Sequence, residues 1–135
     1  MKYTQKDFNQ NLLNRITSIE QKLKKHIEDL MKEYKPIFKD TLKIDGDFEH
    51  EGTHPFKPGY RSAISVGIID EYGEIVNLHT VPIWECNCRF LGLQVSSKIA
   101  GSRLVGELLD ESAEMIKEEL IEFIQNHLEE LNRKG

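Results

Sequence analysis

One short segment has the residue types and spacing of a metal-dependent hydrolase. His50, Glu51 and His54 follow the order H-E-x-x-H, in which two histidines bind zinc and the glutamate activates the metal-bound water. That chemistry needs a helix, because helical geometry places residues four apart on one face. Gly52 is a poor helix former, and Pro55 disfavours helical angles at His54. The segment therefore predicts a polar surface loop, with a metal site that uses Glu51 as base as the alternative hypothesis.

Two cysteines, Cys86 and Cys88, could complete such a metal site. Zinc ribbons use cysteine pairs with two residues between them, and this chain has no second pair. On a strand the two thiols would share a face with Trp84 and Phe90, which favours buried cysteines acting as small apolar side chains. His79 is another candidate ligand, but its parity places it on the opposite face of that strand. We expect buried thiols, with zinc binding alongside the two loop histidines as the alternative.

Between the loop and the cysteines lies the stretch with the clearest strand pattern, residues 60–84. It predicts a β-hairpin whose three-residue loop ends at Gly73, a residue that adopts the left-handed conformation easily. The loop pairs Asp70 with Glu74. The same register pairs Ile68 with Val76, Val66 with Leu78, Ile64 with Thr80 and Tyr60 with Trp84. In that register all the large apolar residues share one face.

The opposite face of the predicted hairpin carries few charges. Its residues are small or mildly apolar: Ala63, Ser65, Gly67, Ile69, Ile75, Asn77, His79 and Val81. A solvated sheet face would carry Lys, Glu or Thr instead. We expect this face to be partly covered, by a helix or by a second copy of the chain.

A long amphipathic helix is predicted before the hairpin, from about residue 4 to residue 35. Thr4 and Asp7 can form a capping pair at its start, and Pro36 ends it. Its apolar stripe has spacings of three and four: Phe8, Leu12, Ile16, Ile19, Leu23, Ile27, Leu30 and Tyr34. Because the stripe is close to a heptad repeat, it could pack on the protein's own sheet or form a coiled-coil-like contact with another helix.

Two further segments flank the hairpin. Residues 38–48 predict a first strand with one wet face, followed by a loop at 49–59. The strand places Phe38, Leu42, Ile44 and Phe48 on one side and Lys39, Lys43, Asp45, Asp47 and Glu49 on the other. After Trp84 the alternation continues to about Phe90, and Pro82 indicates an edge strand or a bend.

The remaining residues predict a linker at 96–102 and a second long helix at 103–132, with Ser102 as its N-cap. Its apolar side would be Leu108, Leu109, Ser112, Ile116, Leu120, Ile124, Leu128 and Leu131. The first helix is rich in lysine and the last in glutamate, so the two could lie side by side. The order indicates one α+β domain over residues 1–135: a long N-terminal helix, a three- to four-stranded antiparallel sheet built on a central hairpin, and a long C-terminal helix.

Composition narrows the classes of partner. The net charge is −5, which argues against nucleic acid, because phosphate backbones attract clustered Lys and Arg. No apolar run approaches the roughly 20 residues of a membrane span, and the first residues do not resemble a signal peptide. With only two cysteines a disulfide framework is not indicated. We expect a cytoplasmic protein with neither membrane nor nucleic acid as partner.

The functional expectation is a non-enzymatic, protein-binding role. No phosphate-binding, dinucleotide-binding or nucleophile-elbow motif is present. A regulator, an adaptor or a toxin inhibitor that acts as a homodimer, or that binds another protein, would fit. The alternatives are the zinc site at His50 and His54 and a small-molecule pocket between sheet and helices near Tyr60, Trp84 and Arg89.

Overall fold

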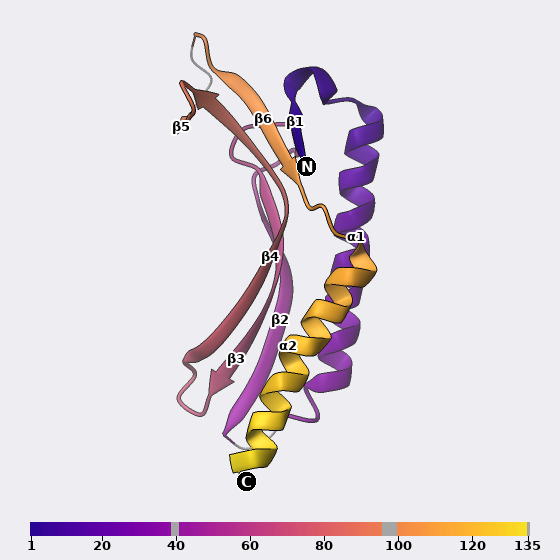
Figure 1. The fold of residues 1–135 in the computed structure, drawn as a ribbon, viewed down its shortest axis with the longest axis vertical. Coiled ribbons are helices and arrows are strands. Elements are labelled where there is room, and N and C mark those ends of the chain that lie inside the picture. Colours follow the sequence, from indigo (N-terminus) through magenta and orange to yellow (C-terminus); the bar gives the residue numbers. More distant parts are fainter. Residues whose placement is uncertain (39–40, 96–99, 135) are drawn as a thin grey trace. The chain divides into compact units, whose positions relative to one another are not determined.

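The computed structural model describes residues 1–38, 41–95 and 100–134 (Figure 1). Its elements in chain order are β1 (Lys2–Thr4), the 3-10 turn η1 (Gln5–Asp7), α1 (Gln10–Tyr34), β2 (Leu42–Glu51), β3 (Arg61–Asp70), β4 (Ile75–Phe90), β5 (Leu93–Val95), β6 (Arg103–Leu108) and α2 (Ala113–Lys134). The α+β class, with a helix toward each end of the sequence, is confirmed. The sheet has six strands rather than three or four.

The strands follow the order β1-β6-β4-β3-β2, and β5 pairs with β4 off this path. β6 is antiparallel to β4 from Trp84 opposite Leu108 to Arg89 opposite Arg103. β1 is antiparallel to β6, with Tyr3 opposite Gly106. The second half of β4 therefore lies inside the sheet, whereas its first half lies beyond the range that pairs with β6.

The chain forms two compact units, and it alternates between them. Unit 1 comprises residues 1–21, 49–63 and 82–110, and unit 2 comprises residues 22–48, 64–81 and 111–135. Each unit therefore contains segments that are far apart in the sequence. A single domain over residues 1–135 stays a prediction, and the units are described in turn.

In unit 1 the chain begins with a strand and a turn where a helix was predicted. Thr4 and Asp7 do pair, since the Thr4 amide donates to Asp7 Oδ2 at 2.9 Å, but this pair closes η1. α1 begins only at Gln10, and the Asn9 side chain caps it by accepting from the Leu12 amide at 2.9 Å. Its end at Tyr34 agrees with the predicted stop at Pro36.

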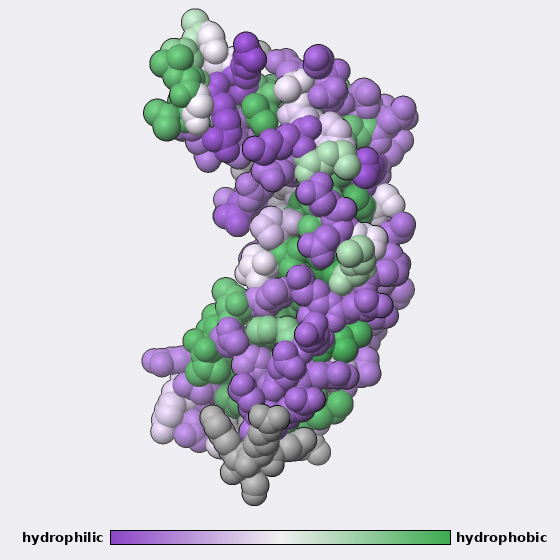
Figure 2. All heavy atoms as spheres, in the orientation of Figure 1, coloured by the Kyte–Doolittle hydropathy of each residue, from purple (hydrophilic) through white to green (hydrophobic). Residues whose placement is uncertain are grey.

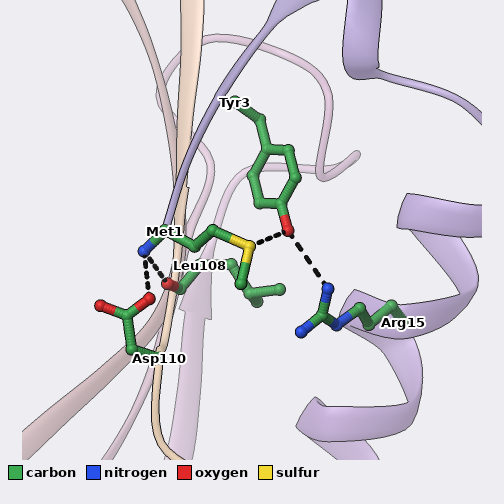
Figure 3. A network of polar contacts seen from close by, with 5 residues as sticks. All are labelled: Met1, Tyr3, Arg15, Leu108 and Asp110. Atoms are coloured by element: carbon green, nitrogen blue, oxygen red, sulfur yellow. Dashed lines mark hydrogen bonds and ion pairs between the residues drawn. The ribbon is translucent and has the colours of Figure 1, made fainter.

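Polar contacts link β1 to its surroundings in unit 1 (Figure 3). The Met1 amino group donates to the Leu108 carbonyl at 2.9 Å and contacts Asp110 Oδ1 at 2.6 Å. The Tyr3 hydroxyl lies against Met1 Sδ and accepts from Arg15 Nη1 at 3.2 Å. These contacts join β1 to the end of β6 and to α1.

The predicted helix at 103–132 is wrong over its first third. Residues 103–108 form β6, which lies between β1 and β4, and α2 starts at Ala113. Ser112 is the N-cap in place of Ser102, because its hydroxyl accepts from the Met115 amide at 3.2 Å. The apolar residues over 103–109 are compatible with a helix or with a strand. The segment forms a strand because it pairs with β4. Residues 96–99 of the predicted linker lie outside the described residues, and the prediction missed β5.

In unit 2 both helices lie on the same side of the strands (Figure 1). A Cβ on Gly46 of β2 would lie 3.0 Å from Ile27 Cδ1 of α1, and the ring of His79 in β4 stacks on Phe123 of α2 at 5.3 Å. The buried apolar residues of this unit are Leu23, Ile27, Leu30, Met31, Tyr34, Phe38, Ile44, Ile64, Val66, Ile68, Val81, Ala113, Ile116, Leu120 and Ile124. The core of unit 2 therefore lies between the helices and one face of the strands.

The predicted faces of β2 are confirmed, although its bounds are not. Ile44 is buried, whereas Lys43, Asp45 and Asp47 are exposed. The strand runs to Glu51, into the predicted loop, and Phe38 precedes it. Lys39 lies outside the described residues, and the side chain of Leu131 in α2 is likewise not described.

The hairpin loop is confirmed, but the register beyond it is not. The Asp70 amide donates to the Glu74 carbonyl at 2.9 Å, as predicted. Further along, the Ser65 hydroxyl lies 3.0 Å from the Thr80 hydroxyl, so these two residues share a face and the register has moved by one. An extra residue in β4, a β-bulge, produces such a shift.

This shift overturns the predicted faces of the hairpin. Val76 and Leu78 are 55% and 53% exposed, whereas they were expected on the buried face. Leu78 lies beside Gly67 of β3. A second shift occurs in unit 1, where Cys86, rather than Trp84, donates its amide to the Tyr60 carbonyl, at 2.9 Å.

The turn between β4 and β5 contains a strained residue. Phe90 pairs with Leu93, so the loop is Leu91 and Gly92, with φ angles of 52° and 79°. A two-residue loop with both φ angles positive suits glycine or asparagine. Leu91 adopts this conformation while 85% exposed, so its side chain gains little burial in return.

We expect Leu91→Asn to stabilise the protein by about 0.5–1 kcal/mol, because asparagine tolerates a left-handed backbone better than leucine. Urea unfolding followed by circular dichroism measures the change. The matched control is Leu93→Asn, in β5, which is also exposed but lies outside the turn. Equal effects of the two substitutions would show that backbone strain at Leu91 is not the cause.

Candidate functional site

Unit 1 is built around the indole of Trp84, which is fully buried. Its ring lies 6.2 Å from Tyr3, 5.8 Å from Phe8 and 6.3 Å from Phe56, measured between centroids. Its Nε1 donates to the Pro55 carbonyl at 2.6 Å. Such aromatic contacts add to the burial of apolar area. Trp84 therefore holds the loop that carries the H-E-x-x-H segment.

The indole also requires a glycine on the neighbouring strand. A Cβ on Gly106 of β6 would lie 2.0 Å from the Trp84 ring, much closer than any real contact. Glycine at this position thus lets the large ring lie against the backbone of β6, as glycines do where a group approaches a strand closely.

The H-E-x-x-H segment is not helical, as its sequence predicted. His50 and Glu51 end β2, and Gly52 has a φ of 92°. The His54 Nδ1 accepts from the Phe56 amide at 3.0 Å. The two histidine rings also have different neighbours, because His50 stacks on Tyr60 at 5.9 Å and His54 lies 5.7 Å from Phe56. The zincin arrangement of two histidines on one helix face is therefore not formed.

The predicted zinc ligands do not come together in the described part of the chain. Within residues 1–38, 41–95 and 100–134, no three His, Cys, Asp or Glu residues are grouped so that they could hold a metal ion. Cys86 and Cys88 are fully buried on β4, as expected for small apolar side chains. Zinc binding stays a prediction, which metal analysis of protein purified without chelator would test.

The Tyr60 hydroxyl forms a hydrogen bond inside unit 1. The hydroxyl donates to Glu20 Oε2 at 2.8 Å, which joins the start of β3 to α1. Burial, and then the Glu20 carboxylate, raise the pKa of Tyr60 above its ordinary value. The phenol is therefore a protonated hydrogen-bond donor in neutral solution.

The predicted small-molecule pocket near Tyr60, Trp84 and Arg89 stays a prediction. Trp84 is enclosed by its aromatic neighbours and Tyr60 is only 6% exposed. Arg89 instead lines a polar depression with Lys2, Glu85, Asn87, Val105, Gly106 and Glu107. Another polar depression, lined by Glu49, His50, Glu51, Arg61 and Ala63, contains part of the H-E-x-x-H segment. Its mixed charges could hydrogen-bond a polar group, but the lining residues include no thiol or hydroxyl nucleophile.

Unit 2 contains a ring ladder that the sequence did not reveal. The ring of Phe123 on α2 lies between His79 at 5.3 Å and His127 at 4.9 Å. His79 Nε2 contacts Glu119 Oε2 at 3.2 Å, and the Asn77 amide lies 2.9 Å from His127 Nε2. The ladder fastens α2 over the first half of β4. Helical spacing places residues 119, 123 and 127 on one side of α2, but their partners in β4 depend on the shifted register.

The other face of the same strand segment is apolar and open. Ile75, Val76 and Leu78 are 61%, 55% and 53% exposed. We call these three residues the open hairpin face. Figure 2 shows apolar residues gathered on the side of unit 2 away from the helices. A contiguous apolar patch on a sheet face is typical of an interaction surface.

We expect Gly106→Ala to destabilise the protein by about 1–3 kcal/mol, because the added methyl group must displace the Trp84 ring from a packed site. Thermal or urea unfolding measures the loss. The matched control is Gly67→Ala in β3, where the nearest atom to the new Cβ would be 3.6 Å away. If both variants lose the same stability, close approach of Trp84 is not the reason for glycine.

Burial raises the pKa of the Cys86 thiol to about 11, and Cys88 adds to this rise. Because only the thiolate reacts and both thiols are fully buried, we expect Cys86 to resist an aromatic disulfide reagent at pH 8 until denaturant is added, and Cys88 to resist it because the reagent cannot reach it. Absorbance of the released thiolate counts the reacting groups. Rapid reaction of either cysteine in the native protein would contradict this prediction.

No helix among the described residues is both long and apolar enough to cross a membrane. Comparison of this chain with protein-family models, with curated proteins and with solved structures gives no match. The function must therefore be argued from the chain's own geometry.

Proposed function

We propose that this chain is a non-enzymatic cytoplasmic protein that binds other proteins and acts as a homodimer, in the manner of a regulator, an adaptor or a toxin inhibitor. The observation that carries the proposal is the open hairpin face. Ile75 and Leu78 lie beside Gly67, on the side of the strands that has no helix, and Ile75, Val76 and Leu78 are each more than half exposed. Packing of two such sheet faces is a common way to bury them.

The stripe on α1 does not offer a second surface for a dimer. Its members Leu12, Ile16, Leu23, Ile27, Leu30 and Tyr34 are buried within the chain. Of the two predicted packing modes, the intramolecular one is therefore realised, and a coiled coil along this stripe would require those residues to leave their own core.

The size of the open hairpin face indicates the strength of the dimer. Burying half of a branched aliphatic side chain contributes about 1 kcal/mol, so the three residues would contribute about 3 kcal/mol in each copy. Association costs at least about 4 kcal/mol in lost rotational and translational freedom. We therefore infer a weak dimer that also uses polar contacts around the apolar centre.

The reactive groups of unit 1 support a non-enzymatic role. The Cys86 thiol is buried, with a raised pKa, and the Tyr60 hydroxyl is engaged with Glu20. Burial keeps both groups protonated, so neither is an activated nucleophile. Both instead satisfy the packing of unit 1.

We expect Leu78→Glu to weaken self-association at least about tenfold, because a carboxylate would be buried in the apolar centre of the interface. Sedimentation velocity over a range of micromolar concentrations measures the dissociation constant. The control is Leu93→Glu, the same change at a 71% exposed leucine of unit 1, which should leave it unchanged. A wild-type chain that stays monomeric throughout that range would refute the homodimer.

A further inference from the structure

The first half of β4 has one edge without a strand partner among the described residues. β6 pairs with β4 only from Trp84 to Arg89, and β5 only from Cys88 to Phe90. β3 flanks the other edge of β4. The segment Ile75–Val81 therefore presents a row of backbone groups along one side. We call this row the free edge.

The free edge lacks the features that protect the two ends of the sheet. β1, at one end, is only three residues long. β2, at the other end, carries exposed charges at Lys43, Asp45, Asp47, Glu49 and Glu51. Short length and charge are the usual ways to prevent edge pairing. Between Ile75 and Val81 there is no Lys, Arg, Asp, Glu or Pro, so past the β-bulge in β4 the free edge is suited to accept another strand.

The surroundings of the free edge are acidic. α2 lies over this part of β4, because Glu119 contacts His79 and His127 contacts Asn77. From residue 113 to 130 the helix carries Glu114, Glu118, Glu119, Glu122, Glu129 and Glu130 against Lys117 alone. The turn before β4 adds Asp70, Glu71 and Glu74. Positively charged side chains on an incoming strand would therefore strengthen its binding.

A second copy of the chain is a poor occupant of this edge. Two β4 strands paired edge to edge would lie about 4.8 Å apart. If the two copies keep their helices on the same side of the joined sheet, each copy's α2 lies over its own β4. The two α2 helices would then be about as close as the two strands, whereas packed helices need about 8–10 Å between their axes. The two helices would also bring carboxylates together. The edge thus favours a strand that carries no covering helix.

We propose that the free edge of β4 binds an extended segment of another protein in which basic residues alternate with apolar ones. The segment adds a strand to the sheet through backbone hydrogen bonds. Because successive side chains point to opposite faces, its basic residues lie beside Glu119 and Glu130 of α2, which contact His79 and His127. Its apolar residues lie beside Val76 and Leu78. The inference rests on the proposed protein-binding role and names the partner's chemistry.

A synthetic peptide tests the proposal. The probe is fluorescein-labelled Lys-Val-Lys-Val-Lys-Val-Lys with blocked termini, and the control is Lys-Lys-Val-Val-Val-Lys-Lys, which has the same composition without the alternation. We expect the alternating peptide to bind at least about tenfold tighter by fluorescence anisotropy. Hydrogen exchange should slow at the amides of residues 75–81.

Paired variants of α2 separate local charge from net charge. Glu119→Gln with Glu130→Gln removes the two carboxylates that contact His79 and His127 beside the free edge, and the glutamine at 119 can still accept from His79. Glu114→Gln with Glu118→Gln removes two carboxylates from elsewhere on the same helix. We expect the first pair to weaken peptide binding about tenfold and the second pair to change it less than twofold.

Each of the following results would overturn the inference: equal affinity for the two peptides, equal effects of the two variant pairs, or slowed exchange only outside residues 75–81. Protection of these amides that grows with protein concentration in the absence of peptide would also overturn it, since a second copy would then occupy the edge. Sedimentation of each sample keeps the proposals separate. A monomer that binds the alternating peptide supports the edge and refutes the homodimer, and a dimer indifferent to the peptide does the reverse.

Discussion

The close approach of the Trp84 ring to the backbone of Gly106 is the constraint on which unit 1 depends. The ring can lie over β6 only because no side chain stands there. In that position it contacts Tyr3 and Phe8 from the start of the chain and accepts Phe56 from the loop. Its Nε1 fixes the Pro55 carbonyl. One glycine thus allows a single side chain to gather a strand, a turn and a loop that are distant in sequence.

Much of the fold could be read from local patterns. The stripe on α1, the alternation in β2 and the loop that ends at Gly73 each follow from nearby residues. β6 could not be read in this way, because its apolar residues continue the spacing of α2 and only its pairing with β1 and β4 makes it a strand. The hairpin register failed for a related reason: it moves by one residue between Glu74 and Thr80, which turns Leu78 to the other face, and by one more before Cys86, which restores the predicted parity.

Some candidate sites could likewise be predicted from nearby residues, and others depend on distant pairing. The non-helical H-E-x-x-H loop and the buried cysteines followed from Pro55 and from strand parity. The ladder of His79, Phe123 and His127 did not, because it joins a strand and a helix whose relation depends on the shifted register. The open hairpin face also results from that shift, since Val76 and Leu78 would otherwise belong to the core. Local sequence patterns cannot predict features that depend on the register between two distant segments.

The pairing of β1 with β6 has a consequence for how the chain folds as it is synthesised. Lys2 lies opposite Glu107, and Thr4 lies opposite Val105, so among the described residues β1 has no strand partner until β6 has left the ribosome. Contacts between residues so far apart in sequence slow folding, because a large loop must close first. Each unit likewise draws on early, middle and late segments. Unit 1 cannot be completed before residue 110 has been made, so a nascent chain would expose the aromatic residues around Trp84 to chaperones until then.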